Sequence, residues 1–166
     1  QRAMPPYDRT MKRLTSLFTR DYVRFLLQVE PQHAEALDIE EPDRELPALS
    51  REVDFVARVR LGAEQCLLLV EFQTRWAADM PRRMAGYCWR LHERYDEPVF
   101  PVVVVLRAGG RLRTAWRMEA LGQPVASCRF TVVPLWQVAG ADVIEQRRVG
   151  LYPLLPLMRW SQSELE

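Results

Sequence analysis

The sequence predicts one α/β domain over residues 1–166, with a mixed β-sheet and a hairpin flanked by helices. Three observations carry this prediction. Apolar residues recur at helical spacing over 8–29, two β-rich runs meet at a Gly-Ala turn within 51–73, and a second helical stretch at 80–94 precedes the apolar run 99–106. A helix, a hairpin, a helix and a further strand pack as layers of helices on a sheet.

The composition is that of a globular protein, with 48% hydrophobic and 27% charged residues. The longest apolar runs, 66–70 and 99–106, are far shorter than the roughly 20 residues that span a bilayer. Cys66, Cys88 and Cys128 are odd in number and widely spaced, which argues against a disulfide framework or a zinc knuckle. We therefore expect a cytoplasmic protein with no membrane partner, and we leave open that it belongs to a longer chain.

The charges nearly balance, and a net charge of +1 does not by itself predict a nucleic-acid surface. The basic residues are almost all arginine, and Lys12 is the only lysine. Arginine suits bidentate contacts with phosphate. A high arginine content also follows from genome composition, so the sequence leaves both explanations open.

Residues 8–29 predict one helix that Pro31 stops, because their apolar residues follow a helical period. These apolar residues are Met11, Leu14, Leu17, Phe18, Val23, Phe25 and Leu26. The acidic, proline-containing segment 31–49 predicts a loop with a short strand at 36–39.

The clearest local pattern is a hairpin. Residues 51–61 are β-rich and alternating, residues 62–63 are a Gly-Ala turn, and residues 65–73 are a second β-rich run. A two-residue turn places Asp54 directly opposite Glu71. Residues in such a pair share a face of the sheet, with Cβ atoms about 4.5–5.5 Å apart.

The two faces of this hairpin differ. One face is apolar throughout and is expected in the core; it holds Val53, Phe55, Ala57, Val59, Leu61, Cys66, Leu68, Val70 and Phe72. The other face is aliphatic in its middle, at Val56, Leu67 and Leu69. At its open end this second face carries the acids, and there Glu52 lies opposite Gln73.

Carboxylates side by side at the end of a buried hairpin repel one another. A hard divalent cation removes that repulsion, and Mg²⁺ takes one or two carboxylates together with water and phosphate oxygens. Asp54, Glu71 and Gln73, with Glu52 beside them, are therefore the candidate site. The alternative is that the acids pair with arginines at a solvated sheet edge; the candidates are Arg51, Arg58 and Arg75.

The next helix is capped by Asp79 or Met80 and carries Pro81 in its first turn. Its apolar stripe comprises Met80, Met84, Tyr87, Cys88, Leu91 and Tyr95. After the strand 99–106 we expect two further strands, a short helix and an apolar segment, at 111–118, 129–136, 142–147 and 152–158. The apolar residues of 152–160 are one candidate for contact with a second copy, with ordinary domain packing as the alternative.

An Asp on one strand, a hairpin turn and Glu71-Phe72-Gln73 on the next strand resemble the PD-(D/E)XK nuclease superfamily, whose second strand carries Glu-x-Lys. The chain resembles more closely the Rpn-like group of recombination-promoting nucleases and transposase-like proteins, in which Glu-x-Gln commonly replaces Glu-x-Lys. Three further stretches are similar to that group: YDRTMKRLTSLF, DMPRRMAGY and GLYPLLPLM. The resemblance implies a restriction-endonuclease-like core.

The resemblance also implies roles for individual residues. Asp54 and Glu71 would bind Mg²⁺ (or Mn²⁺), together with the backbone carbonyl of Phe72. Gln73 would occupy the lysine position and orient the attacking water or the scissile phosphate. Asp8, on the first helix, would complete the site; its alternative role is a charge at a helix N-terminus.

Two further residues are accessory candidates. Arg83 and Tyr87 lie one helical turn apart and share a face beside the end of the hairpin. Arg83 would hold a phosphate and Tyr87 would pack or donate a hydrogen bond there. The alternatives are that Tyr87 belongs to the core and that Arg83 only neutralises the acids.

Glutamine at position 73 is the departure from the superfamily pattern, because a neutral amide cannot stabilise developing negative charge as lysine does. Lys12 or Arg83 would have to supply that charge. We expect a Mg²⁺-dependent DNA endonuclease linked to recombination or mobile elements, with DNA as partner and a homodimer as the candidate assembly. The alternative is a catalytically inactive domain of the same fold that binds nucleic acid or protein.

Overall fold

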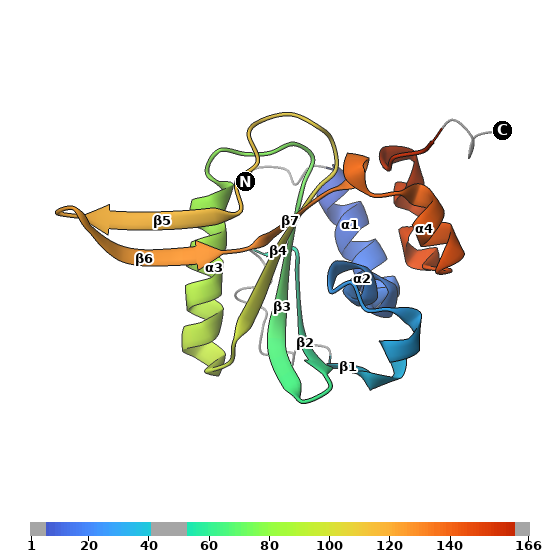
Figure 1. The fold of residues 1–166 in the computed structure, drawn as a ribbon, viewed down its shortest axis with the longest axis horizontal. Helices are drawn as coiled ribbons and strands as arrows, with labels where there is room; N and C mark the ends of the chain where they lie inside the picture. The colour runs from blue at the N-terminus through green and yellow to red at the C-terminus, as the bar shows by residue number, and fades with distance from the viewer. Residues whose placement is uncertain (1–5, 41–52, 162–166) are drawn as a thin grey trace.

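The computed structural model describes residues 6–40 and 53–161, with side chains from Arg9 onward. The described residues form a mixed five-stranded sheet flanked by helices (Figure 1). Its strands, in their order across the sheet, are β1 (Leu37–Glu40), β2 (Phe55–Leu61), β3 (Glu64–Gln73), β4 (Val99–Val105) and β7 (Thr131–Pro134). β1, β2 and β3 are antiparallel, whereas β3, β4 and β7 run parallel. The expected mixed sheet with a hairpin between helices is confirmed.

Helices cover both faces of the sheet (Figure 1). On one face lies the long helix α3; the other is covered by α1, α2, α4 and the 3-10 segment η3. Their bounds are α1 Pro6–Leu17, α2 Thr19–Leu26, α3 Met80–Tyr95, α4 Gly140–Glu145 and η3 Val149–Leu157. Each face has its own hydrophobic cluster, so β3, in the middle of the sheet, is buried on both sides.

The predicted hairpin register is confirmed. Phe55 pairs with Val70 and Leu61 with Glu64 across a two-residue turn. Asp54 lies in the bend just before β2, where its N–H contacts the Glu71 carboxyl group. The apolar face packs in the cluster under α1 and α2 as expected, with two exceptions. Val53 packs in the other cluster, because the chain bends before β2 begins. Leu61 is 39% exposed because it ends at the turn.

The prediction of one helix over residues 8–29 is wrong. The helix is interrupted at Phe18, whose backbone (φ −126°, ψ 38°) is not helical, and α2 then ends at Leu26, well before Pro31. The break lets α2 pack against η3. At that contact the Gly150 N–H donates to Asp21 Oδ2 at 2.8 Å, and a Cβ on Gly150 would lie 2.2 Å from Phe18 Cβ. This long-range packing overrides the continuous helical pattern.

The prediction of strands at 111–118 and 129–136 is also wrong in its boundaries. β5 (Ala115–Ala120) and β6 (Gln123–Arg129) form a separate two-stranded hairpin, the β5–β6 arm, which extends beside α3 and away from the main sheet (Figure 1). β7 begins only after Phe130, which is buried and turns the chain back into the sheet. The turn of the arm is Leu121-Gly122, with both residues at positive φ, as in a type I′ hairpin turn.

Four other predicted elements agree with the structure. β1, α3, β4 and α4 lie where the patterns place them, within a few residues, and the apolar stripe of α3 is buried except for the half-buried Tyr95. The first part of the segment predicted as a loop forms a 3-10 helix, Pro31–Ala36. In the C-terminal apolar segment, Leu154 and Met158 are buried in the core, so ordinary packing accounts for much of it. No helix among the described residues is long and apolar enough to cross a membrane.

The two-sided core makes a prediction for Leu69, whose side chain on β3 is fully buried. Leu69→Ala should lower the free energy of unfolding by about 2–5 kcal/mol, because it removes buried methyl groups and leaves a cavity. Urea denaturation measures this loss. Leu61→Ala on the neighbouring strand is the control and should cost much less; equal losses for the two variants would contradict the described burial.

Candidate active site

Asp54 and Glu71 are held together by reciprocal hydrogen bonds. The Phe72 N–H donates to Asp54 Oδ2 at 2.8 Å, and the Asp54 N–H donates to Glu71 Oε1 at 3.2 Å. Asp54 lies just before β2, and Glu71 lies near the end of β3. The hairpin register thus brings both carboxyl groups to one end of the sheet, as the sequence predicts.

Glu71 is the unusual group of this pair. It is 2% exposed, and burial is the main cause that raises its pKa. The negative charge of Asp54 also raises the pKa, whereas Arg83, the Asp54 N–H and Lys12 lower it, and together they leave the pKa at about 8. Burial therefore outweighs the neighbouring cations, and near neutral pH the carboxyl group is largely protonated.

Two basic side chains from different helices reach the acids. Lys12 of α1 places Nζ 3.7 Å from Asp54 Oδ1. Arg83 of α3 places Nη2 3.4 Å from Glu71 Oε2 and donates to the Tyr87 hydroxyl at 3.4 Å. The structure therefore brings the sole lysine and the accessory pair of α3 to the same acids.

The Gln73 side chain hydrogen-bonds to the backbone of its own strand. Its Nε2 donates to the carbonyl oxygen of Phe72 at 3.1 Å, the oxygen expected to serve as a metal ligand. The Gln73 side chain is half-buried and lies at the same end of the sheet as Asp54 and Glu71. The carbonyl oxygen of Phe72 therefore already accepts a hydrogen bond from the neighbouring side chain.

Some residues that the sequence suggested for the site, or as partners of its acids, either lie outside the described residues or have other partners. Glu52 and Arg51 lie outside the described residues, and so does the side chain of Asp8. Arg58 pairs with Glu97 at 2.7 Å and Glu40 at 3.5 Å instead of with the site acids. The suggested pairing of the acids with a sheet-edge arginine thus fails for Arg58. Lys12 and Arg83, the two residues considered from the sequence as sources of positive charge, are the cationic partners of the acids, and two helices bring them from outside the hairpin.

The residues present fit a small divalent cation. Mg²⁺ needs only one or two carboxylates in addition to waters and phosphate oxygens, and Asp54, Glu71 and the Phe72 carbonyl meet that need. A cation there would stabilise the ionised form of the buried Glu71. Within residues 6–40 and 53–161, no cluster of three or more His, Cys, Asp or Glu side chains is placed to bind a metal.

Comparison with known proteins identifies no relative of this chain. No protein-family model, no curated protein and no solved structure gives a significant match to this chain. What this site does must therefore be argued from its own residues.

The raised pKa of Glu71 predicts how stability changes with pH in metal-free buffer. In the unfolded chain the carboxyl group ionises near pH 4.5, but in the folded protein only near pH 8. Stability should therefore be greatest below pH 4.5, as far as this group is concerned, and fall on the order of a few kcal/mol as pH rises through 8.

Urea denaturation between pH 5 and pH 9 measures this fall, with EDTA present. Glu71→Gln cannot ionise and should lose much less stability over the same range. A wild-type protein whose pH dependence equals that of Glu71→Gln would show that Glu71 ionises normally in the folded state.

Proposed function

We propose that this protein is a Mg²⁺-dependent (or Mn²⁺-dependent) endonuclease that hydrolyses phosphodiester bonds of DNA. The observation that carries the proposal is the buried Glu71 carboxyl group beside Asp54, with basic groups of two helices converging on the pair. An acid pair that needs compensating positive charge, next to cationic side chains suited to phosphate, supports metal-assisted phosphoryl chemistry.

Each residue of the site has its own role in this proposal. Asp54, Glu71 and the Phe72 carbonyl would hold the metal ion, which when bound polarises a phosphoryl group and lowers the pKa of bound water. The amide of Gln73, half-buried beside them, orients the attacking water or the scissile phosphate. Asp54 is kept in place by the Phe72 N–H, so its carboxylate needs no reorganisation on binding.

Lys12 takes the place of the missing motif lysine. Its Nζ lies 3.7 Å from Asp54 Oδ1, on the helix that faces the end of the hairpin. A cation at that distance can stabilise the negative charge that develops on a phosphate held at the acids, which the neutral Gln73 cannot do. Arg83, anchored between Glu71 and Tyr87, is the group that would hold a second phosphate oxygen.

The resemblance to the Rpn-like group supports a role in recombination or mobile elements, in the cytoplasm. Cutting both strands of a duplex needs two sites, which supports a homodimer as the working form.

One observation favours a second candidate, a catalytically inactive domain of the PD-(D/E)XK fold that binds nucleic acid or protein. The Gln73 amide is bound to its own backbone, and both acids already have cationic partners. A site whose acids are neutralised by its own side chains needs no metal ion for stability. A plasmid-nicking assay separates the two candidates.

Nicking of supercoiled plasmid DNA in Mg²⁺ or Mn²⁺ tests the proposal. Wild type should nick the plasmid, and Glu71→Ala should lose at least 100-fold in rate, a loss on the order of that seen when one catalytic group is removed. Glu64→Gln removes an exposed acid from the other end of the same strand and should keep full activity. Equal nicking by wild type and Glu71→Ala would refute the site, and no nicking by wild type would favour the inactive domain.

The role of Lys12 predicts a rescue. Lys12→Gln should slow nicking by roughly 10- to 100-fold, because it removes positive charge from beside Asp54. Arg13→Gln, at an exposed neighbouring position, is the control and should have little effect. Adding Gln73→Lys to Lys12→Gln should restore much of the rate by returning the cation to the strand. Failure of this rescue, or an equal loss in the control, would show that Lys12 does not supply the charge.

A further inference from the structure

The segment that runs from the end of β4 through the β5–β6 arm has a clear excess of positive charge. Residues 106–130 contain five arginines and one glutamate, a net charge of +4, whereas the whole chain carries only +1. The five are Arg107, Arg111, Arg113, Arg117 and Arg129, and all are exposed. None of them forms an ion pair with another described residue, in contrast to Lys12, Arg58 and Arg83. These charges are available to an outside anion.

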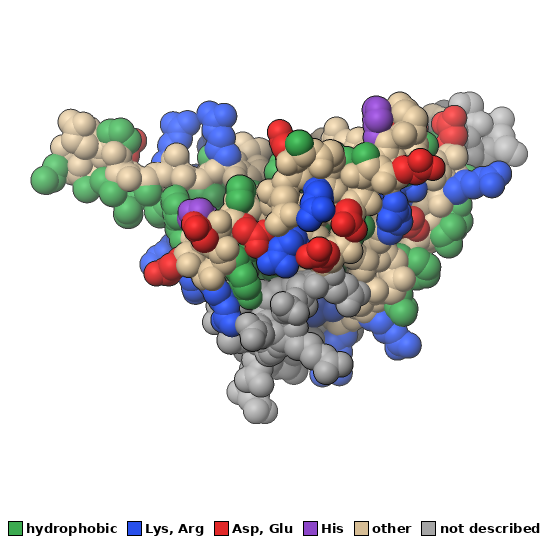
Figure 2. Space-filling view, turned by 90° about the horizontal axis from the view of Figure 1, so that it is seen from below, with side chains coloured by type: hydrophobic (Ala, Val, Ile, Leu, Met, Phe, Trp, Pro, Cys, Tyr) green, Lys and Arg blue, Asp and Glu red, His purple; other side chains and the backbone are tan. Residues whose placement is uncertain are grey.

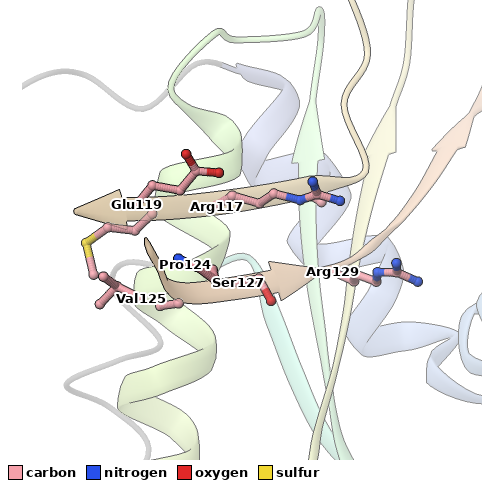
Figure 3. Close-up of a pocket in the computed structure, with 9 residues that line it drawn as sticks. Arg117, Glu119, Pro124, Val125, Ser127 and Arg129 are labelled. Atoms are coloured by element: carbon pink, nitrogen blue, oxygen red, sulfur yellow. The ribbon is translucent and has the colours of Figure 1, made fainter. Parts of the chain in front are cut away.

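Side chains along the β5–β6 arm alternate between its two faces. Trp116 pairs with Cys128, whose side chain meets Cys88 of α3, so this face turns toward the helix. Arg117 pairs with Ser127, and Arg129 lies one pair further along the same face. This outer face bounds an open groove of about 440 Å³. Figure 3 shows Arg117 and Arg129 extending in the same direction, toward the base of the arm.

The surface view agrees with this sorting. In Figure 2 basic side chains stand out along one side of the arm, and hydrophobic atoms line its other side. The acidic side chains of this view gather mainly over the body of the molecule rather than over the arm (Figure 2). In this view the arm therefore presents basic side chains on one side, apart from most of the acidic ones (Figure 2).

The basic segment starts at the candidate active site. Where the chain leaves β4, the Leu106 N–H donates to the Gln73 carbonyl and the Arg107 N–H to the Thr74 carbonyl, at 2.8 and 2.9 Å. Arg75 lies over Gly109, with Nη1 3.4 Å from the position of a Cβ there. Basic side chains thus continue from the residue two places after Gln73, through the loop 107–114, to the arm.

We propose that the outer face of the β5–β6 arm, with the loop that leads to it, binds the phosphate backbone of double-stranded DNA and guides it to the site at Asp54 and Glu71. This inference rests on the proposed DNA substrate and names the surface that recognises it. Unpaired arginines match phosphate in charge and geometry. A two-stranded ribbon also fits the major groove of B-DNA but not the deep, narrow major groove of duplex RNA, which favours DNA as the duplex whose backbone the arm contacts.

Fluorescence anisotropy with a labelled 20-base-pair DNA duplex, in EDTA to prevent cleavage, tests the inference. The double variant Arg117→Gln/Arg129→Gln should raise the dissociation constant about 10-fold or more. It should also reduce the salt slope of log K by about 1.8, since each phosphate contact contributes about 0.9. Arg117→Lys/Arg129→Lys keeps the charge and should restore the slope.

The matched control is Arg147→Gln/Arg159→Gln, which removes two exposed arginines from the α4 and η3 side of the sheet. It should bind like wild type. Thermal melts of all variants check folding, which exposed residues without ion pairs should not disturb.

Three results would overturn the inference: no binding of the duplex by wild type, an arm variant that binds as tightly as wild type, or an equal loss in arm and control variants. Binding of an RNA duplex of the same sequence as tightly as the DNA would overturn the choice of partner. An arm that serves a second copy of the chain instead would leave DNA affinity unchanged in the arm variant.

The two proposals fail separately. Duplex binding through the arm without metal-dependent nicking would keep this inference and refute the endonuclease. Nicking that the arm substitutions leave unchanged, in rate and in KM, would keep the endonuclease and refute the arm.

Discussion

The burial of the Glu71 carboxyl group is the constraint around which the site is arranged. β3 is covered on both faces, so an acid near its end loses water that nothing apolar can replace. Three groups compensate in part for this loss. The Asp54 N–H donates a hydrogen bond to Glu71, Arg83 of α3 forms an ion pair with it, and Lys12 forms an ion pair with Asp54. These contacts only partly offset the burial, and the pKa of Glu71 stays near 8. A carboxyl group kept in this state is poised to gain from an added cation.

The parallel pair β3 and β4 places the acid pair and the start of the arginine-rich loop at one edge of the sheet. Both strands end at the same edge, so the chain after β3, which leads to α3, lies beside the chain after β4, which leads to the arm. The acids stand at this edge, and the arginine-rich loop begins next to Gln73. Acid site and basic surface therefore follow from one topological feature.

Local patterns predicted most elements, and their failures have a common cause. The hairpin, α3 and β4 combine a strong period with clear turn or cap residues, and these were predicted within a few residues. The break at Phe18 and the division of 111–136 into arm and sheet strand depend on contacts with Gly150, Cys88 and the edge of β4. Such contacts join segments far apart in the chain, and no local period records them.

By itself the sequence determined the β2–β3 register, from Phe55 opposite Val70 to Leu61 opposite Glu64, because a two-residue turn and the alternation of side chains are local properties of the chain. Only the tertiary structure decided that Glu71 is buried and that Lys12 and Arg83 reach these acids. It also decided that Arg117 and Arg129 lie on one face of an arm that follows the arginine-containing loop after β4. Burial and charge pairing depend on how helices and hairpins from distant segments pack on the sheet, which the pattern of a single strand does not contain.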